Sequence, residues 1–120
     1  MQVDLDHIFK VAKEAAERSQ CRYNVSCVLV DKRGDVVSIG INHWSSNRPK
    51  MGRRTVHAEL DAIRGIKKMK ESNLYAFIYR CGAGGATRNI NCCDACKSLL
   101  RAYGIEKIFY MTENEEWVRA

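Results

Sequence analysis

The stretch RTVHAELDAI, residues 54–63, combines two patterns that decide how this chain folds. Its second half begins an amphipathic helix that we expect to run to about Lys70. One face of that helix carries Glu59, Ala62, Ile63, Ile66 and Met69. Its first half places His57 and Glu59 two positions apart at the helix start. Such a pair is either exposed and without a task, or it is half of a site whose remainder lies elsewhere in the chain.

Two β-branched runs precede this helix and predict a hairpin. They are NVSCVLV (24–30) and DVVSIGIN (35–42), joined by the turn sequence DKRG. Further upstream, apolar residues recur at helical spacing, and Asp4 or Asp6 can cap the first turn. Residues 4–19 should therefore form a helix. A polar stretch, HWSSNRPKMGRR, separates the hairpin from the second helix.

Three more core elements and a short final strand follow. In chain order the expected segments are the strand LYAFIYR (74–80), the glycine-rich loop CGAGGATRNIN (81–91), a third helix from Cys93 to Tyr103 that Gly104 stops, the strand KIFYM (107–111), and a short strand within EWVRA (116–120). This order contains two strand–helix–strand units, and such crossovers make neighbouring strands parallel. We predict an α/β fold, a three-layer α/β/α sandwich with a mixed, largely parallel sheet, in one domain over residues 1–120.

The composition is that of an ordinary soluble globular protein. Of the 120 residues, 46% are hydrophobic and 28% are charged, with a single proline. No apolar run approaches a membrane span, and the N-terminus has no signal-peptide pattern, so we expect a cytoplasmic protein with no membrane partner. Its six cysteines are then metal ligands or small buried residues rather than disulfides. The net charge of +6 indicates a partner that carries phosphate.

The second half of the site is NCCDAC, residues 91–96. Cys93 and Cys96 form a C-x-x-C at the start of the third helix, as His57 and Glu59 lie at the start of the second. Both helices follow strands at the same sheet edge, so their N-termini can converge. One imidazole and two thiolates make a three-ligand zinc set with the fourth position left for water, and helix N-termini favour thiolates. Glu59 points away from the metal and toward that open position.

This arrangement resembles the zinc-dependent cytidine/deoxycytidylate deaminase superfamily, which has an H-x-E…P-C-x-x-C signature. The element order also matches, GIN (40–42) falls where the family has a sugar-binding asparagine, and AYGIEKIFY (102–110) is similar to the family's passage from helix to strand. The resemblance implies hydrolytic deamination with Zn²⁺ as cofactor. Zinc held by His57, Cys93 and Cys96 would activate water, and Glu59 would carry protons to the base and the leaving amine.

The expected substrate-binding residues are Asn42, Trp44, Arg53, Arg54 and Ala58, which lies between His57 and Glu59. The resemblance assigns the sugar to Asn42, although asparagine is also common after strands for conformational reasons. Trp44 is either a stacking platform for a base or a loop anchor. The basic run that contains Arg53 and Arg54 is equally a phosphate site or a solvated face.

Three departures from the family pattern bear on the site. Cys92 stands where the family has proline, so it is an alternative ligand, although we favour Cys93 because C-x-x-C aims both sulfurs inward. The loop from Cys81 to Cys92 is longer than usual. Trp44 stands where free-cytidine deaminases have a glutamate, which favours a nucleotide or a nucleic-acid base as substrate.

Three functions compete. The first is deamination of cytosine in a nucleotide or nucleoside, with a dCMP/CMP-type substrate favoured, and small size supports it. The second is deamination of a base in single-stranded DNA or RNA, which the positive charge and Trp44 support. The third is a non-catalytic zinc-binding module, whose closed site would need Cys92 or Cys81, and Glu59 argues against it. We also expect a homo-oligomer, because some apolar helix surface stays incompletely covered. The residues concerned are Ile66, Met69, Leu99 and Tyr103.

Overall fold

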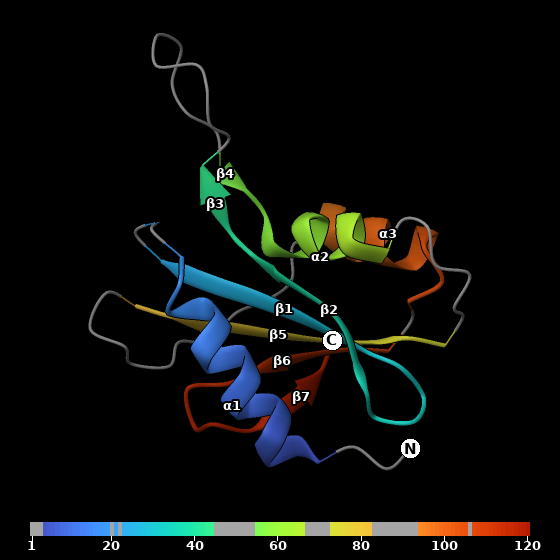
Figure 1. Ribbon diagram of the computed structural model, residues 1–120, viewed down its shortest axis with the longest axis horizontal. Coiled ribbons are helices and arrows are strands. Elements are labelled where there is room, and N and C mark those ends of the chain that lie inside the picture. Colours follow the sequence, from blue (N-terminus) through green and yellow to red (C-terminus); the bar gives the residue numbers. More distant parts are fainter. Residues whose placement is uncertain are drawn as a thin grey trace, which may run out of the picture.

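The computed structural model describes residues 4–19, 21, 23–44, 55–66, 73–82, 94–105 and 107–120 (Figure 1). In chain order the elements are α1 (Leu5–Ala16), β1 (Asn24–Val30), β2 (Val36–Ile41), β3 (His43–Trp44), β4 (Thr55–Val56), α2 (Ala58–Ile66), β5 (Tyr75–Cys81), α3 (Asp94–Ala102), β6 (Lys107–Met111) and β7 (Trp117–Arg119). The predicted helices and core strands are therefore present. None of the helices in these ranges combines the length and the apolar character needed to cross a membrane.

The main sheet has five strands in the order β2-β1-β5-β6-β7. Strand β1 is antiparallel to both β2 and β5, β5 is parallel to β6, and β6 is antiparallel to β7. The sheet is mixed, as predicted, but the prediction that it is largely parallel was wrong. The physical reason is that β1 pairs with β5 as well as with its hairpin partner. The crossover through α2 consequently joins β2 and β5, which run the same way but are not neighbours.

Helices cover both faces of this sheet, which confirms the α/β/α layering (Figure 1). Successive residues of β1 alternate between two cores. Cys27 and Leu29 pack with α2 and α3, whereas Val28 and Val30 pack with α1. Strand β5 alternates in the same way, so each of its residues can be assigned to one face. The face that α2 and α3 cover is the one that holds the predicted site.

Helix α2 lies unusually close to β2 at Gly40. A Cβ added to Gly40 would clash with the Ala58 carbonyl oxygen and the Ala62 nitrogen, both of them backbone atoms of α2. Beside it, the Ser38 hydroxyl donates a 2.7 Å hydrogen bond to the Ala62 carbonyl. Only a residue without a side chain lets the two backbones approach this closely. Gly40 therefore sets the height of the α2 N-terminus above the sheet.

The helix ends follow the predicted signals with one difference. The Asp4 carboxylate accepts from the His7 N–H at 3.1 Å and caps α1, but α1 ends at Ala16 rather than at residue 19. Helix α3 ends at Ala102, two residues before Gly104, whose φ of 81° matches the predicted stop. There the N–H of Ile105 donates to the Leu100 carbonyl at 3.0 Å, which closes the end of the helix.

A small two-stranded sheet, β3 with β4, was not predicted. It pairs His43 with Val56 and Trp44 with Thr55 in antiparallel register, so the two ends of the polar stretch lie side by side. Apolar residues are scarce in that stretch, and two-residue strands leave little pattern to detect. Of the apolar helix surface expected to be uncovered, Tyr103 is exposed and Leu99 half-buried, whereas Ile66 is buried. Met69 and Lys70 lie outside the described residues.

Candidate metal and catalytic site

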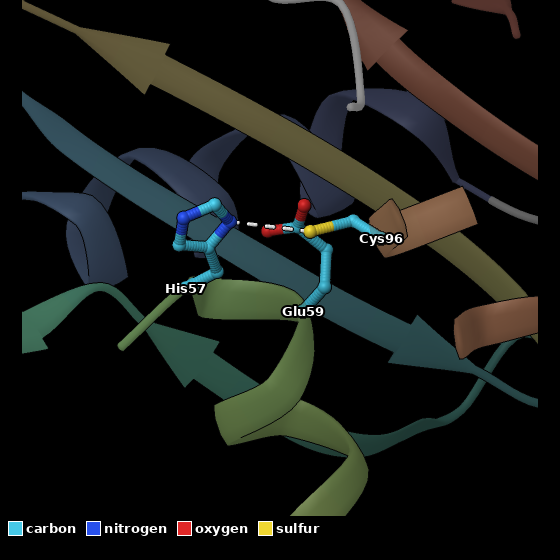
Figure 2. A group of neighbouring side chains, drawn as sticks. All are labelled: His57, Glu59 and Cys96. Atoms are coloured by element: carbon cyan, nitrogen blue, oxygen red, sulfur yellow. Dashed lines mark hydrogen bonds between the residues drawn. The ribbon is translucent and has the colours of Figure 1, made fainter. Parts of the chain in front are cut away.

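The site begins where α2 and α3 start. His57 directly precedes α2, and its carbonyl accepts the first-turn hydrogen bond from the Asp61 N–H at 3.1 Å. Cys96 lies in the first turn of α3. The His57 Nδ1 and Cys96 Sγ atoms are 3.2 Å apart (Figure 2). The predicted convergence of the two helix starts is therefore observed for this pair of residues.

Glu59 completes the cluster from within α2. Its ligand atoms and those of His57 and Cys96 all lie within 4.8 Å of one another. Glu59 is only 4% exposed and Cys96 7%, whereas His57 is exposed. Figure 2 shows the three side chains turned toward a common point. A carboxylate held this deep in a core is costly unless it has partners, so its position beside an imidazole and a thiol indicates a specific site.

The donors of this cluster fit a zinc ion. Imidazole nitrogen and thiolate sulfur are the ligands that zinc takes in three-ligand catalytic sites, and a nearby carboxylate suits a proton-transfer group. Cys96 is the cysteine of the described part of the chain that belongs to the cluster. Cys93, the predicted third ligand, and its alternative Cys92 lie outside the described residues. The choice between them stays a prediction.

Cys81, the other cysteine considered for a closed zinc site, lies on the wrong face of the sheet. It is 1% exposed and packs in the α1-side core with Phe77 and Tyr79, whereas Cys96 belongs to the core on the opposite side. Burial raises the pKa of the Cys81 thiol, which keeps it protonated at neutral pH. Cys81 therefore cannot complete a closed site with His57 and Cys96.

Asn42 lies directly after β2 and its side chain joins three segments. Its Oδ1 accepts from the Val25 N–H at 2.8 Å and from the Ser19 hydroxyl at 2.7 Å, while its Nδ2 donates to the Tyr23 carbonyl at 2.7 Å. These bonds give Asn42 a structural task that the sequence does not reveal. Among the described contacts, the second hydrogen of Nδ2 has no acceptor. If Asn42 binds the sugar, as predicted, this hydrogen is the donor that it can offer.

Of the other predicted substrate-binding residues, the structure describes Trp44 and Ala58. Trp44 is 39% exposed on β3. Ala58 is the first residue of α2 and fully buried, so a ligand contact there would use its backbone rather than its methyl group. Arg53 and Arg54 lie outside the described residues. Their phosphate-binding role stays a prediction.

Two neighbouring side chains support the site and were not singled out from the sequence. The Asp61 Oδ2 atom accepts from the Ile41 N–H at 3.0 Å, and its Oδ1 lies 3.3 Å from the Nε2 atom of His43. Asp61 therefore ties α2 to the end of β2 and to β3. An aspartate in the first turn of a helix is also common for electrostatic reasons alone, so the sequence carried no signal for this network.

The sequence matches the family model described as the cytidine and deoxycytidylate deaminase zinc-binding region over residues 2–112. No curated protein matches it significantly.

Several solved structures share the fold. The dCMP deaminase from the cyanophage S-TIM5, in apo form, superposes with a TM-score of 0.68 at 20% identity, covering 93% of this chain and 86% of that chain. The same phage enzyme in complex with dCMP and dUMP gives 0.66 at 19%, covering 93% and 84%. Cytidine deaminase from Mycobacterium leprae gives 0.66 at 19%, covering 98% and 94%. At these identities the superpositions show a common fold. The family match spans nearly the whole chain and includes His57, Glu59 and Cys96, and the chain therefore belongs to the cytidine and deoxycytidylate deaminase family.

Proposed function

We propose that this protein is a zinc-dependent enzyme that hydrolytically deaminates cytosine in a nucleotide or nucleoside, giving the uracil product and ammonia. We favour a dCMP/CMP-type substrate and a cytoplasmic setting, where the thiols stay reduced. The observation that carries the proposal is the cluster of His57, Glu59 and Cys96 at two helix starts. A purely structural zinc site has no need of a buried carboxylate beside its ligands, which argues against a non-catalytic module.

In this proposal His57, Cys93 and Cys96 hold the zinc ion. When bound, zinc supplies a nucleophile by lowering the pKa of a coordinated water toward neutrality. Glu59 is left for proton transfer because the two cysteines and the histidine already make a complete three-ligand set. The short His57–Cys96 distance and the helix N-terminus beside each residue support this division of roles.

Glu59 then moves the protons of the reaction. Its carboxylate takes a proton from the attacking water as the water oxygen bonds to C4 of cytosine. The carboxyl group passes that proton to the ring nitrogen N3. In a second transfer Glu59 carries the remaining hydroxyl proton to the amine, the C4–N bond breaks, and ammonia leaves as the C4 carbonyl forms. Burial of Glu59 supports this role, since a carboxylate shielded from water exchanges protons with the bound substrate rather than with solvent.

Several features support a nucleotide substrate over a free nucleoside. Trp44 occupies the place of the glutamate found in free-cytidine deaminases, and Arg53 and Arg54 lead into His57. Guanidinium groups suit phosphate because they form charge-assisted, often bidentate hydrogen bonds. The phage dCMP deaminase of the same fold was solved with dCMP and dUMP bound. A base within single-stranded DNA or RNA is the second candidate, and the exposed ring of Trp44 and the charge of +6 favour it.

Ammonia release from cytidine, deoxycytidine, dCMP and a short cytosine-containing oligonucleotide tests the proposal. We expect the highest kcat/KM on the mononucleotide, with Arg53→Ala or Arg54→Ala reducing nucleotide turnover far more than nucleoside turnover. Raising the salt concentration distinguishes a polynucleotide substrate from a mononucleotide. A polynucleotide bound through several phosphates loses affinity steeply as salt rises, whereas a mononucleotide loses much less. Zinc-replete protein that deaminates none of the four would refute the proposed function.

A further inference from the structure

Arg80 lies on the site face of the sheet, one position before the end of β5. Residues alternate along this strand, with Ala76 and Ile78 in the core under α2 and α3 and Phe77 and Tyr79 under α1. Arg80 continues the first series. It pairs in register with Val25 of β1, which also packs against the α2-side core. A guanidinium group is thus brought to the carboxyl end of β5, on the same side as Glu59 and Cys96.

The side chain of Arg80 is held by a ring rather than by a carboxylate. Its Cζ atom lies 4.2 Å from the centroid of the Tyr23 ring. Its Nε atom is buried and has no hydrogen-bond partner, and among the described residues no ion pair involves Arg80. Stacking on a ring occupies the face of a guanidinium and leaves the donors in its plane. A half-buried cation with unused donors is suited to binding an anion, and none of the described residues supplies one within ion-pair distance.

Two rows of residues cross the sheet below the site and give the relative positions of Gly40, Asn42 and Arg80. Gly40, Cys27 and Ile78 are in register in the first row, and α2 begins directly above Gly40. The second row lies two residues further along each strand, about 7 Å away. It contains Asn42, hydrogen-bonded to Val25, and then Arg80.

The second row places the residue assigned to the sugar and Arg80 on either side of Val25. Their backbones are two strand spacings apart, about 10 Å. The two are also linked through Tyr23, whose carbonyl accepts from Asn42 while its ring carries Arg80. A base that reacts at Glu59 and a sugar at Asn42 would therefore direct the next group of the substrate toward Arg80.

We infer that Arg80, stacked on Tyr23, is a specificity-determining residue that binds the phosphate attached to the substrate's sugar. This inference rests on the proposed function, which it deepens by naming a phosphate ligand inside the fold in addition to the predicted Arg53 and Arg54. The phosphate belongs either to a mononucleotide or to a strand, and both present the same anion to the guanidinium.

The test compares Arg80→Gln, Arg80→Lys and the wild-type enzyme on dCMP, deoxycytidine and a short oligonucleotide. Arg80→Gln should raise KM for dCMP about 10- to 100-fold, the loss expected for a charged hydrogen bond, with a change of less than about threefold on deoxycytidine. Arg80→Lys should recover part of the loss because it keeps the charge without the fork. Arg101→Gln, an exposed position at the end of α3, is the matched control for a lost positive charge.

The ratio of the activities on dCMP and on deoxycytidine distinguishes a lost phosphate contact from a folding defect, since a damaged fold lowers both activities together. Calorimetric titration with dUMP and with deoxyuridine gives a second readout that needs no turnover, and the nucleotide advantage should shrink in Arg80→Gln. Loss on the oligonucleotide but not on dCMP would assign the phosphate to a strand. Equal losses on dCMP and deoxycytidine, or wild-type enzyme that uses both equally well, would overturn the role of Arg80 and leave the proposed deamination standing. Wild-type enzyme inactive on all three would overturn both.

Discussion

The Nδ1 atom of His57 and the Sγ atom of Cys96 lie 3.2 Å apart although 39 positions separate the two residues in the chain. Neither residue reaches the other through local structure. His57 is placed by the contact of α2 with Gly40, and Cys96 by the packing of α3 beside α2 in the same core. The distance therefore reports the tertiary arrangement of two helix starts, and the first three predictions test what that arrangement does.

Replacing Cys96 by serine should remove zinc and lower the melting temperature, because the hydroxyl is a poor zinc ligand and metal binding contributes to folding. Metal analysis of the purified variant, together with its thermal unfolding, measures both effects. Cys21→Ser is the matched control. Cys21 is half-buried and lies outside the cluster, so this variant should retain zinc as the wild type does. Cys93→Ser should behave like Cys96→Ser, and Cys92→Ser like the control. Full zinc occupancy in Cys96→Ser would contradict the assignment.

Glu59→Gln should keep zinc and fold but lower kcat by about 10²- to 10⁴-fold, because the amide preserves the shape and cannot transfer protons. Steady-state kinetics on zinc-replete protein measure this. Glu14→Gln, at an exposed position of α1 on the other side of the sheet, should leave kcat unchanged. Near-normal turnover in Glu59→Gln would rule out its proton-transfer role.

Gly40→Ala should destabilise the protein by about 1–3 kcal/mol or more, since the new methyl group meets backbone atoms that cannot rotate away. Movement of the α2 N-terminus should also weaken zinc retention, which a competition assay with a chelator measures. Ile39→Val is the control at the adjacent position, whose side chain is 38% exposed, and should cost about 0.5 kcal/mol or less. An unchanged free energy of unfolding in Gly40→Ala would mean that α2 is not held at this height.

Asp31, in the turn between β1 and β2, should make the free energy of unfolding depend on pH in the acid range. The backbone N–H of Asp35 donates to its Oδ1 at 2.9 Å, and with the N–H and charge of Arg33 it holds the pKa of Asp31 below its ordinary value despite burial. The stabilisation is therefore fully present above the unfolded pKa of about 3.9 and is lost as the pH falls through the lower folded value. Urea unfolding across this range should show the wild-type advantage over Asp31→Asn shrinking as the pH falls. A constant difference would contradict this.

Self-association is expected because Tyr103 at the end of α3 is 48% exposed and Leu99, on the same helix, is half-buried. Closed symmetry is the usual outcome for such surfaces. Analytical ultracentrifugation at micromolar protein should give a dimer or a larger closed assembly, and Tyr103→Glu should shift it toward the monomer. A monomer at every concentration would count against this expectation.

The sequence by itself determined the elements and the chemical types of the site. Helical and alternating periodicity, with a capping aspartate and a terminal glycine, are local properties of the chain, so α1, β1, β2, α2, β5, α3 and β6 were predictable. The spacing of His57 from Glu59 and of Cys93 from Cys96 is local as well. It defined a zinc-type donor set before any contact between the two motifs was known.

Only the tertiary structure decided which strands are neighbours and which side chains share a face. The insertion of β1 between β2 and β5 made the sheet mostly antiparallel, because pairing partners depend on contacts between distant segments that periodicity does not encode. The same holds for Asn42, whose amide ties Ser19, Tyr23 and Val25 together, and for Cys81, which the strand turns to the opposite face from Cys96. Arg80 became a candidate ligand only when β5 brought it level with Asn42, since no local pattern distinguishes it from an ordinary surface arginine.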